Sequence, residues 1–198
     1  MFDVEAFILV GGTSSRMGKD KSQLRFGERT SVQIIGGELQ SVAPSVVTVG
    51  AQAPLDGDLS NIPDSRLNWG PLAGIHAALG HARSEFCLIV ACYFPFVSSK
   101  LFERLLDCVN ESDAVVPVQR DRRIQPLCSV YRRSPCVAAA QKAIAAGEHS
   151  PRALLDRIRV RYVSFNEISD LEGSEYFFYN VNTPDNYERA KQIFQSQR

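Results

Sequence analysis

Residues 6–21 read AFILVGGTSSRMGKDK, and this stretch decides how the rest of the chain is interpreted. Its first five residues are apolar, which is typical of a short buried strand. Gly11 and Gly12 follow at once, and they let the backbone turn tightly and bring its N–H groups against an anion. Arg16 and Lys21 add two cations that can form charge-assisted hydrogen bonds to phosphate oxygens. The stretch therefore predicts a strand that opens into a phosphate-binding loop.

Two common phosphate-binding motifs do not match this loop. The P-loop requires G-x-x-x-x-G-K-[ST], whereas Gly12 and Gly18 are six positions apart and Lys19 and Asp20 follow them. The dinucleotide fingerprint requires G-x-G-x-x-G, which the sequence at Gly11 does not supply. The pattern that remains is G-G-x-x-x-R-M-G-x-D-K.

Composition limits the class of protein. The 198 residues are 44% hydrophobic and carry 22 acidic and 22 basic side chains, which is ordinary for one globular enzyme domain over residues 1–198. The zero net charge argues against a nucleic-acid partner. No apolar run has the length of a membrane span, and residues 1–7 do not resemble a signal peptide. Because the cysteines form no C-x-x-C pair, we expect free thiols in a reducing cytoplasm; they are Cys87, Cys92, Cys108, Cys128 and Cys136.

Strand and helix patterns alternate along the chain. We expect strands at residues 6–10, 45–50, 86–92, 114–118, 126–131, 160–165 and 176–181. Helices are expected to begin near Thr30, Pro71, Ser98, Pro135, Pro151 and Pro184, most of them at a capping residue or a first-turn proline. This order predicts an α/β sandwich with a mainly parallel sheet and helices on both faces. Ligands of such sheets bind at the carboxyl ends of the strands.

The loop pattern resembles the signature of nucleotidyltransferases, and its spacing is similar to that of the molybdenum cofactor guanylyltransferase (MobA) family. Four further motifs follow in the family's order: Asp64 with GPLAG at 70–74, ACYFPF at 91–96, QPL at 125–127 and NVNTP at 180–184. The resemblance covers almost the whole chain. It implies a Rossmann-like nucleotidyltransferase sandwich that transfers GMP from GTP to molybdenum-molybdopterin and releases pyrophosphate.

The resemblance also implies roles for individual residues. Nucleotide binding would involve Leu9, Val10, Gly11, Gly12, Lys21, Gly50 and Asp64, with Arg16 and Lys21 as the catalytic cations. The acceptor would be bound by Gln125, Pro126, Arg152, Asn180 and Asn182. Mg²⁺ is the implied cofactor, held at the position of Tyr93 with help from Asn182. The implied partners are GTP, molybdenum-molybdopterin and a molybdoenzyme or cofactor-insertion protein, with no membrane.

Tyr93 departs from the family, which has an aspartate at this position. Mg²⁺ offsets the repulsion between two anionic substrates, and it prefers carboxylate oxygens as ligands. A phenol is neutral at pH 7 and is a poor ligand for a hard cation. Three interpretations remain open here: Asp64 and water hold the metal, the protein binds ligands without turnover, or position 93 is altered.

Other functions of the same fold also remain open. They are a cytidylyltransferase for the same cofactor, a sugar-phosphate nucleotidyltransferase, and a non-catalytic accessory protein. One further aromatic residue is ambiguous: Trp69, beside Gly70 and Pro71, could stack on a flat ring or pack against its own loop.

Overall fold

The computed structural model describes residues 2–11, 21–51 and 55–196. Seven strands form one sheet in the order β5-β4-β1-β6-β8-β7-β9. Their bounds are β1 Val4–Leu9, β4 Val46–Val49, β5 Ser60–Ile62, β6 Phe86–Ala91, β7 Ala114–Pro117, β8 Cys128–Arg132 and β9 Val160–Val163. A separate two-stranded ribbon consists of β2 (Arg25–Phe26) and β3 (Arg29–Thr30).

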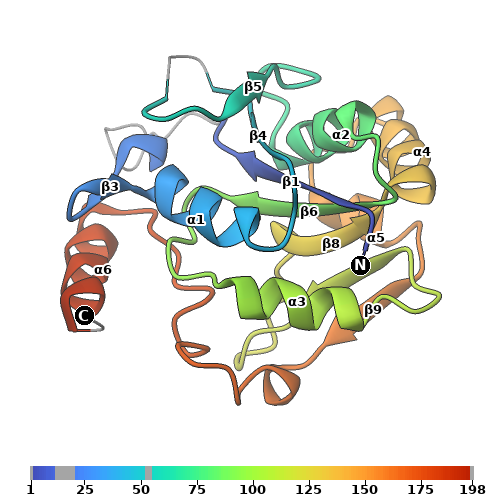
Figure 1. The fold of residues 1–198 in the computed structure, drawn as a ribbon. Coiled ribbons are helices and arrows are strands. Elements are labelled where there is room, and N and C mark those ends of the chain that lie inside the picture. Colours follow the sequence, from blue (N-terminus) through green and yellow to red (C-terminus); the bar gives the residue numbers. More distant parts are fainter. Residues whose placement is uncertain (1, 12–20, 52–54, 197–198) are drawn as a thin grey trace.

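The large sheet is mainly parallel, as predicted. Strand β1 runs parallel to both of its neighbours, β4 and β6, and β5 and β9 are parallel to the strands that they pair with. Strand β8 is antiparallel to β6 and to β7. The carboxyl ends of β1, β4 and β6 therefore meet at one edge of the sheet, which Figure 1 shows between β5 and α1.

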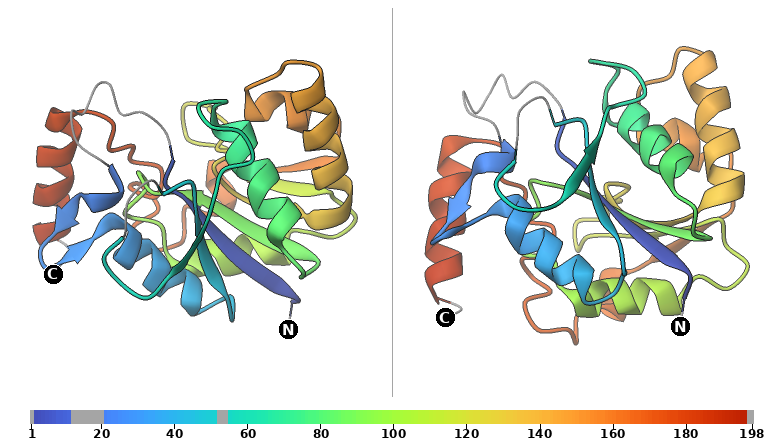
Figure 2. Two further views of the ribbon diagram at one scale, coloured as in Figure 1. Left: turned by 90° about the horizontal axis from the view of Figure 1, so that it is seen from above. Right: turned by 45° about the horizontal axis from the view of Figure 1, so that its top comes forward.

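Helices cover both faces of the sheet (Figures 1 and 2). The helices are α1 Ser31–Gln40, α2 Pro71–His81, α3 Ser99–Asp107, α4 Arg133–Ala145, α5 Pro151–Leu155 and α6 Pro184–Ser196. Alternation along β1 separates the two cores: Ala6 and Ile8 pack with α1 and α3, whereas Phe7 and Leu9 pack with α2, α4 and α5. Within the described ranges, no helix is long and apolar enough to span a bilayer.

Helix α6 lies beside the β2–β3 ribbon rather than on the main sheet (Figure 1). A third apolar cluster joins Phe26 of the ribbon to Ala190 and Ile193 of α6, together with Phe96 and Val181. The phenol of Tyr187 donates a hydrogen bond to the carbonyl of Arg25 at 2.6 Å. This contact joins α6 to strand β2, which follows the predicted phosphate-binding stretch, although 162 positions separate the two residues.

The predicted strand at residues 176–181 is wrong. Residues 172–178 form successive turns, in which the N–H of Tyr179 donates to the carbonyl of Tyr176 at 2.8 Å. The aromatic side chains that suggested a strand point in two directions: Phe177 and Phe178 are buried in the α1–α3 core, and Tyr176 and Tyr179 are partly buried against Phe96. Aromatic residues are common in strands because their side chains pack well there. In this segment the turns allow the same packing without strand hydrogen bonds.

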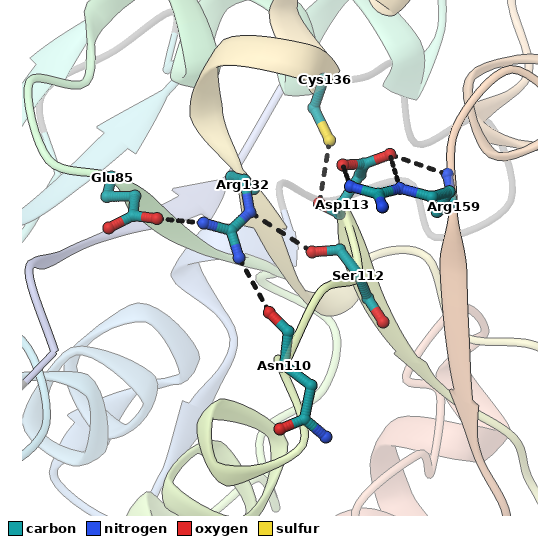
Figure 3. Close-up of polar contacts among 7 residues, drawn as sticks. All are labelled: Glu85, Asn110, Ser112, Asp113, Arg132, Cys136 and Arg159. Carbon is teal, nitrogen blue, oxygen red and sulfur yellow. Dashed lines mark hydrogen bonds and ion pairs between the residues drawn. The ribbon is translucent and has the colours of Figure 1, made fainter.

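A polar network ties together the opposite end of the sheet (Figure 3). The Asp113 carboxylate, just before β7, accepts hydrogen bonds from the backbone N–H of Arg159 at 2.9 Å and from its guanidinium. Arg132, at the end of β8, pairs with Glu85. The Cys136 thiol donates to the carbonyl of Asp113 at 3.1 Å. The network therefore joins the amino ends of β6, β7 and β9 and lies away from the edge where β1, β4 and β6 end.

Candidate active site

A cavity of about 330 Å³ opens at the carboxyl ends of β1, β4 and β6. Its walls come from seven separate stretches of the described chain, as expected for a ligand site of an open α/β sheet. The cavity brings together many of the residues predicted from sequence: Leu9, Val10, Gly11, Lys21, Asp64, Tyr93 and Asn182. The other described residues that line the cavity are Val49, Asn68, Gly70, Pro71, Gly74, Ala91, Cys92 and Leu127.

The end of β1 packs closely against the end of β4. The N–H groups of Val10 and Gly11 both donate to the carbonyl of Val49, at 3.0 and 3.3 Å. A Cβ on Gly11 would lie 3.2 Å from the carbonyl oxygen of Gly50, whose own φ of 84° is unfavourable for other residues. Gly50 therefore packs against the backbone of Gly11, and it is not among the described residues that line the cavity. Gly12 and Arg16 lie outside the described residues.

Asp64 follows β5 and lines the same cavity. Its Oδ1 is buried and has no hydrogen-bond partner within the described residues. Burial raises the pKa of the Asp64 carboxyl above its ordinary value, and the backbone N–H groups of Arg66 and Ser65 oppose this shift. Asp64 therefore offers an acceptor to a donor group of a ligand.

Lys21, Tyr93 and Asn182 meet at the end of β6. The Lys21 ammonium donates to Oδ1 of Asn182 at 2.5 Å, and its Nζ lies 5.3 Å from the centroid of the Tyr93 ring. The N–H of Val181 donates to the carbonyl of Tyr93 at 3.1 Å, which fixes the segment that carries Asn182. The buried Ser31 hydroxyl at the start of α1 donates to the carbonyl of Cys92 and holds the same turn.

The Tyr93 side chain is partly buried. Its ring meets Phe94 edge to face with centroids 4.7 Å apart, and burial is the main cause that raises the pKa of the phenol above its ordinary value. The phenol is therefore neutral at physiological pH. It brings no negative charge to the end of β6.

The predicted acceptor residues do not all lie in the cavity. Gln125 and Pro126 precede its lining residue Leu127; the Gln125 amide donates to Gln119, and the carbonyl of Pro126 accepts from the Tyr131 phenol at 2.6 Å. Asn180 stands two residues before Asn182 and is not a lining residue. Arg152 is exposed in the first turn of α5, and is not among the described residues that line the cavity.

A stacked pair at the cavity rim escaped the sequence reasoning. The Trp69 indole lies on the His149 imidazole, and the guanidinium of Arg66 lies 4.8 Å from the Trp69 ring. The sequence left open whether Trp69 stacks on a ring or packs against its own loop, and its partner proves to be a residue 80 positions away. The sequence signal for this contact is weak. It consists of two expected helix starts, Gly70-Pro71 and Ser150-Pro151, each with an aromatic residue directly before it.

Comparison with known proteins identifies the family. Residues 6–162 match the family model described as a MobA-like NTP transferase domain. The chain belongs to this family. It is 32% identical over 200 residues to a probable molybdenum cofactor guanylyltransferase of Pelotomaculum thermopropionicum, covering 100% of this chain and 97% of that protein. It is also 28% identical over 199 residues to a molybdenum cofactor guanylyltransferase of Desulfosudis oleivorans, covering 98% of each.

Solved structures agree with the predicted fold. The chain resembles molybdopterin-guanine dinucleotide biosynthesis protein A of Archaeoglobus fulgidus with a TM-score of 0.79 and 25% identity, covering 97% of this chain and 99% of that one. It resembles 2-C-methyl-D-erythritol 4-phosphate cytidylyltransferase of Thermus thermophilus with a TM-score of 0.71 and 17% identity, covering 96% and 98%. The Rossmann-like nucleotidyltransferase sandwich is therefore confirmed.

Nucleotidyltransferases of this family typically use a divalent metal, but the donors that the described residues offer at the end of β6 do not fit one. Tyr93 presents a neutral phenol, and the amide oxygen of Asn182 already accepts from Lys21. In the part of the chain that the structure describes, no group of three or more His, Cys, Asp and Glu side chains could hold a metal ion. Asp64 is the one carboxylate among the described lining residues.

Proposed function

We propose that this protein transfers GMP from GTP to molybdenum-bound molybdopterin, which yields the molybdopterin guanine dinucleotide cofactor and pyrophosphate. One observation carries the proposal: on the family's fold, Lys21, Asp64 and Asn182 come from three of its motifs and line a single cavity. The names of the relatives, which cover the full length of the chain, support the choice of nucleotide and acceptor.

The proposed chemistry is a displacement at the α-phosphorus of GTP. An oxygen of the acceptor's terminal phosphate forms the new P–O bond, and the bond from the α-phosphorus to the bridging oxygen of pyrophosphate breaks. Lys21 binds the phosphates and offsets their charge, as catalysis of phosphoryl transfer depends mainly on positioning and electrostatics. Because Gly11 donates its N–H to Val49, the proposal assigns further phosphate contacts to Gly12 and Arg16.

On the nucleotide side, we assign Leu9, Val10 and Asp64 to the pocket for the nucleoside, and Gly50 to its support. The buried Oδ1 of Asp64 can accept a hydrogen bond from a nucleoside N–H or O–H group. Gln125, Pro126, Arg152 and Asn180 are assigned to the acceptor, beyond the described lining residue Leu127. Arg152 stands in the first turn of α5, exposed to an approaching anion.

Nucleotide preference is testable without the acceptor. A ligand that binds only the folded state raises the melting temperature, and at equal concentration the ligand that binds more tightly raises it more. We expect GTP to raise the melting temperature more than CTP, ATP or UTP at equal concentration. A larger shift with CTP would favour the cytidylyltransferase alternative, and equal shifts with all four would contradict a guanine-specific pocket.

The main experiment combines the protein with labelled GTP, Mg²⁺ and the molybdenum-molybdopterin cofactor and measures pyrophosphate. The wild-type protein and the Tyr93→Asp variant are assayed side by side. Pyrophosphate from the wild type supports the transferase. No pyrophosphate from either protein would overturn it.

Tyr93 favours one second function, a non-catalytic accessory protein that holds the nucleotide or cofactor for a molybdoenzyme. This alternative predicts GTP binding without turnover in the wild type and turnover only after Tyr93→Asp. Under either function we propose that the chain acts as one nucleotidyltransferase domain, residues 1–198, in the cytoplasm.

A further inference from the structure

At the end of β6, Tyr93 supplies no charge where the family's aspartate would supply a negative one, and the Lys21 ammonium lies against its ring. The Lys21 ammonium lies between the carboxamide of Asn182, at 2.5 Å, and the face of the Tyr93 ring, at 5.3 Å from its centroid. All three residues line the cavity. Their chain segments are far apart, so their meeting is a property of the fold.

The surroundings favour this ammonium over a divalent cation. A metal ion bound beside Tyr93 would repel the Lys21 ammonium, and the neutral phenol would offer no charge to offset that repulsion. The ring face attracts the ammonium, and the carboxamide oxygen of Asn182 accepts a hydrogen bond from it. Both contacts hold the Lys21 ammonium in this position, and the hydrogen bond to Asn182 occupies the carboxamide oxygen that a metal would need.

We propose that this pocket binds its nucleoside triphosphate with Lys21 as the counter-charge at the end of β6, and without a divalent cation bound at that place. The inference rests on the proposed function and deepens it. Mg²⁺ cancels two negative charges of a triphosphate, so the metal-free form is attracted more strongly to an ammonium. The pocket therefore binds metal-free GTP at least as tightly as it binds the Mg²⁺ complex.

The test measures the dissociation constant of GTP by calorimetry, once with EDTA and once with saturating Mg²⁺ at matched ionic strength. For the wild type we expect the two constants to agree or the metal-free form to bind more tightly. For Tyr93→Asp we expect the order to reverse, with the Mg²⁺ complex tighter by about tenfold, because a carboxylate both binds the metal and repels free triphosphate. Binding of the Mg²⁺ complex to the wild type that is tighter by about twofold or more overturns the inference.

Two matched variants identify the group responsible. Tyr93→Phe keeps the ring face and removes only the phenol oxygen, so we expect it to behave like the wild type. Lys21→Met keeps much of the side chain's bulk and removes the charge, so we expect metal-free GTP to bind about tenfold more weakly or worse. A Lys21→Met variant with wild-type affinity for metal-free GTP would also overturn the inference.

The outcomes separate this inference from the proposed function. If the wild type prefers the Mg²⁺ complex and Asp64→Asn removes that preference, Asp64 holds the metal and the inference fails, while the proposed function stands. If folded wild-type protein, checked by its melting curve, binds GTP in neither condition, both fail.

Discussion

The Trp69 indole and the His149 imidazole are stacked, with ring centroids 4.1 Å apart and planes inclined by 29°. Backbone contacts strengthen the pair: the Trp69 indole N–H donates to the carbonyl of Glu148 at 3.0 Å, and Nδ1 of His149 lies 3.1 Å from the carbonyl of Trp69. Gly70 and Pro71 beside Trp69 line the cavity, and His149 stands just before α5. The stack therefore joins the nucleotide side of the pocket to the proposed acceptor helix.

Removal of this stack should weaken both stability and binding. We expect Trp69→Ala to lower the free energy of unfolding by about 2 kcal/mol, from the lost ring pair and hydrogen bond. Because the loop with Gly70 and Pro71 loses this support, the dissociation constant of GTP should rise by about three- to tenfold, or ~1 kcal/mol. Urea unfolding and calorimetry measure the two effects. Trp69→Phe retains a ring on His149 and should lose less in both; equal losses in the two variants would show that stacking contributes little.

Alanine substitution should have opposite effects on stability at two glycines at the ends of α2. Gly70 has φ 81° and ψ −179°, a region that is nearly closed to other residues, and its Cβ would lie 3.2 Å from the carbonyl oxygen of His149. We expect Gly70→Ala to destabilise the protein by about 2 kcal/mol. Gly80 is helical with nothing within 4 Å of a Cβ, so Gly80→Ala should stabilise by about 0.5–1 kcal/mol. Urea unfolding of both variants tests the pair, and a neutral Gly70→Ala would contradict it.

Acid should weaken the network around Asp113. Hydrogen bonds from the Arg159 side chain are the main cause that lowers the pKa of Asp113 below 3.8, and the Arg159 backbone N–H acts in the same direction. A carboxyl with a lower pKa in the folded state stabilises the fold above its unfolded pKa, and this contribution disappears as the pH falls through the folded value. We therefore expect the free energy of unfolding to decrease as the pH drops below 3.8.

The matched variants isolate this carboxylate. Asp113→Asn should lose about 1 kcal/mol at pH 7, a modest value because Arg159 is largely exposed, and its stability should depend less on acid. Asp121 pairs with Arg123 on the surface, and Asp121→Asn should leave stability unchanged. Urea unfolding between pH 3 and pH 7 supplies the comparison. An Asp113→Asn variant with the wild-type acid dependence would assign that dependence to other carboxyls.

Thiol reactivity should distinguish one cysteine from the other four. Cys108 is partly exposed, whereas Cys87, Cys92, Cys128 and Cys136 are buried. Burial raises the pKa of Cys87 to about 12, so this thiol is both inaccessible and protonated. We expect one thiol to react with Ellman's reagent in the folded protein and all five in denaturant. Cys108→Ser should abolish the early reaction; an early reaction that survives this change would contradict the buried positions.

Much of this protein could be predicted from local patterns alone. The apolar run of β1 predicted a buried strand. Thr30 and Ser98 cap the helices that they were expected to begin, and Ser150 caps the helix expected at Pro151. The phosphate-loop pattern and four further motifs identified the family, which the family match confirms. Such features lie within a few residues, where strand alternation, capping and turn geometry act directly.

Other features depended on contacts between distant segments. Only the folded chain shows that Lys21 meets Asn182, that Trp69 stacks on His149, and that residues 176–181 form turns rather than a strand. The order of the strands and the reversed direction of β8 determine these contacts, and an apolar run carries no information about its neighbours or its direction. The sequence therefore identified Tyr93 as the unusual residue, and the tertiary structure placed the ammonium of Lys21 against it.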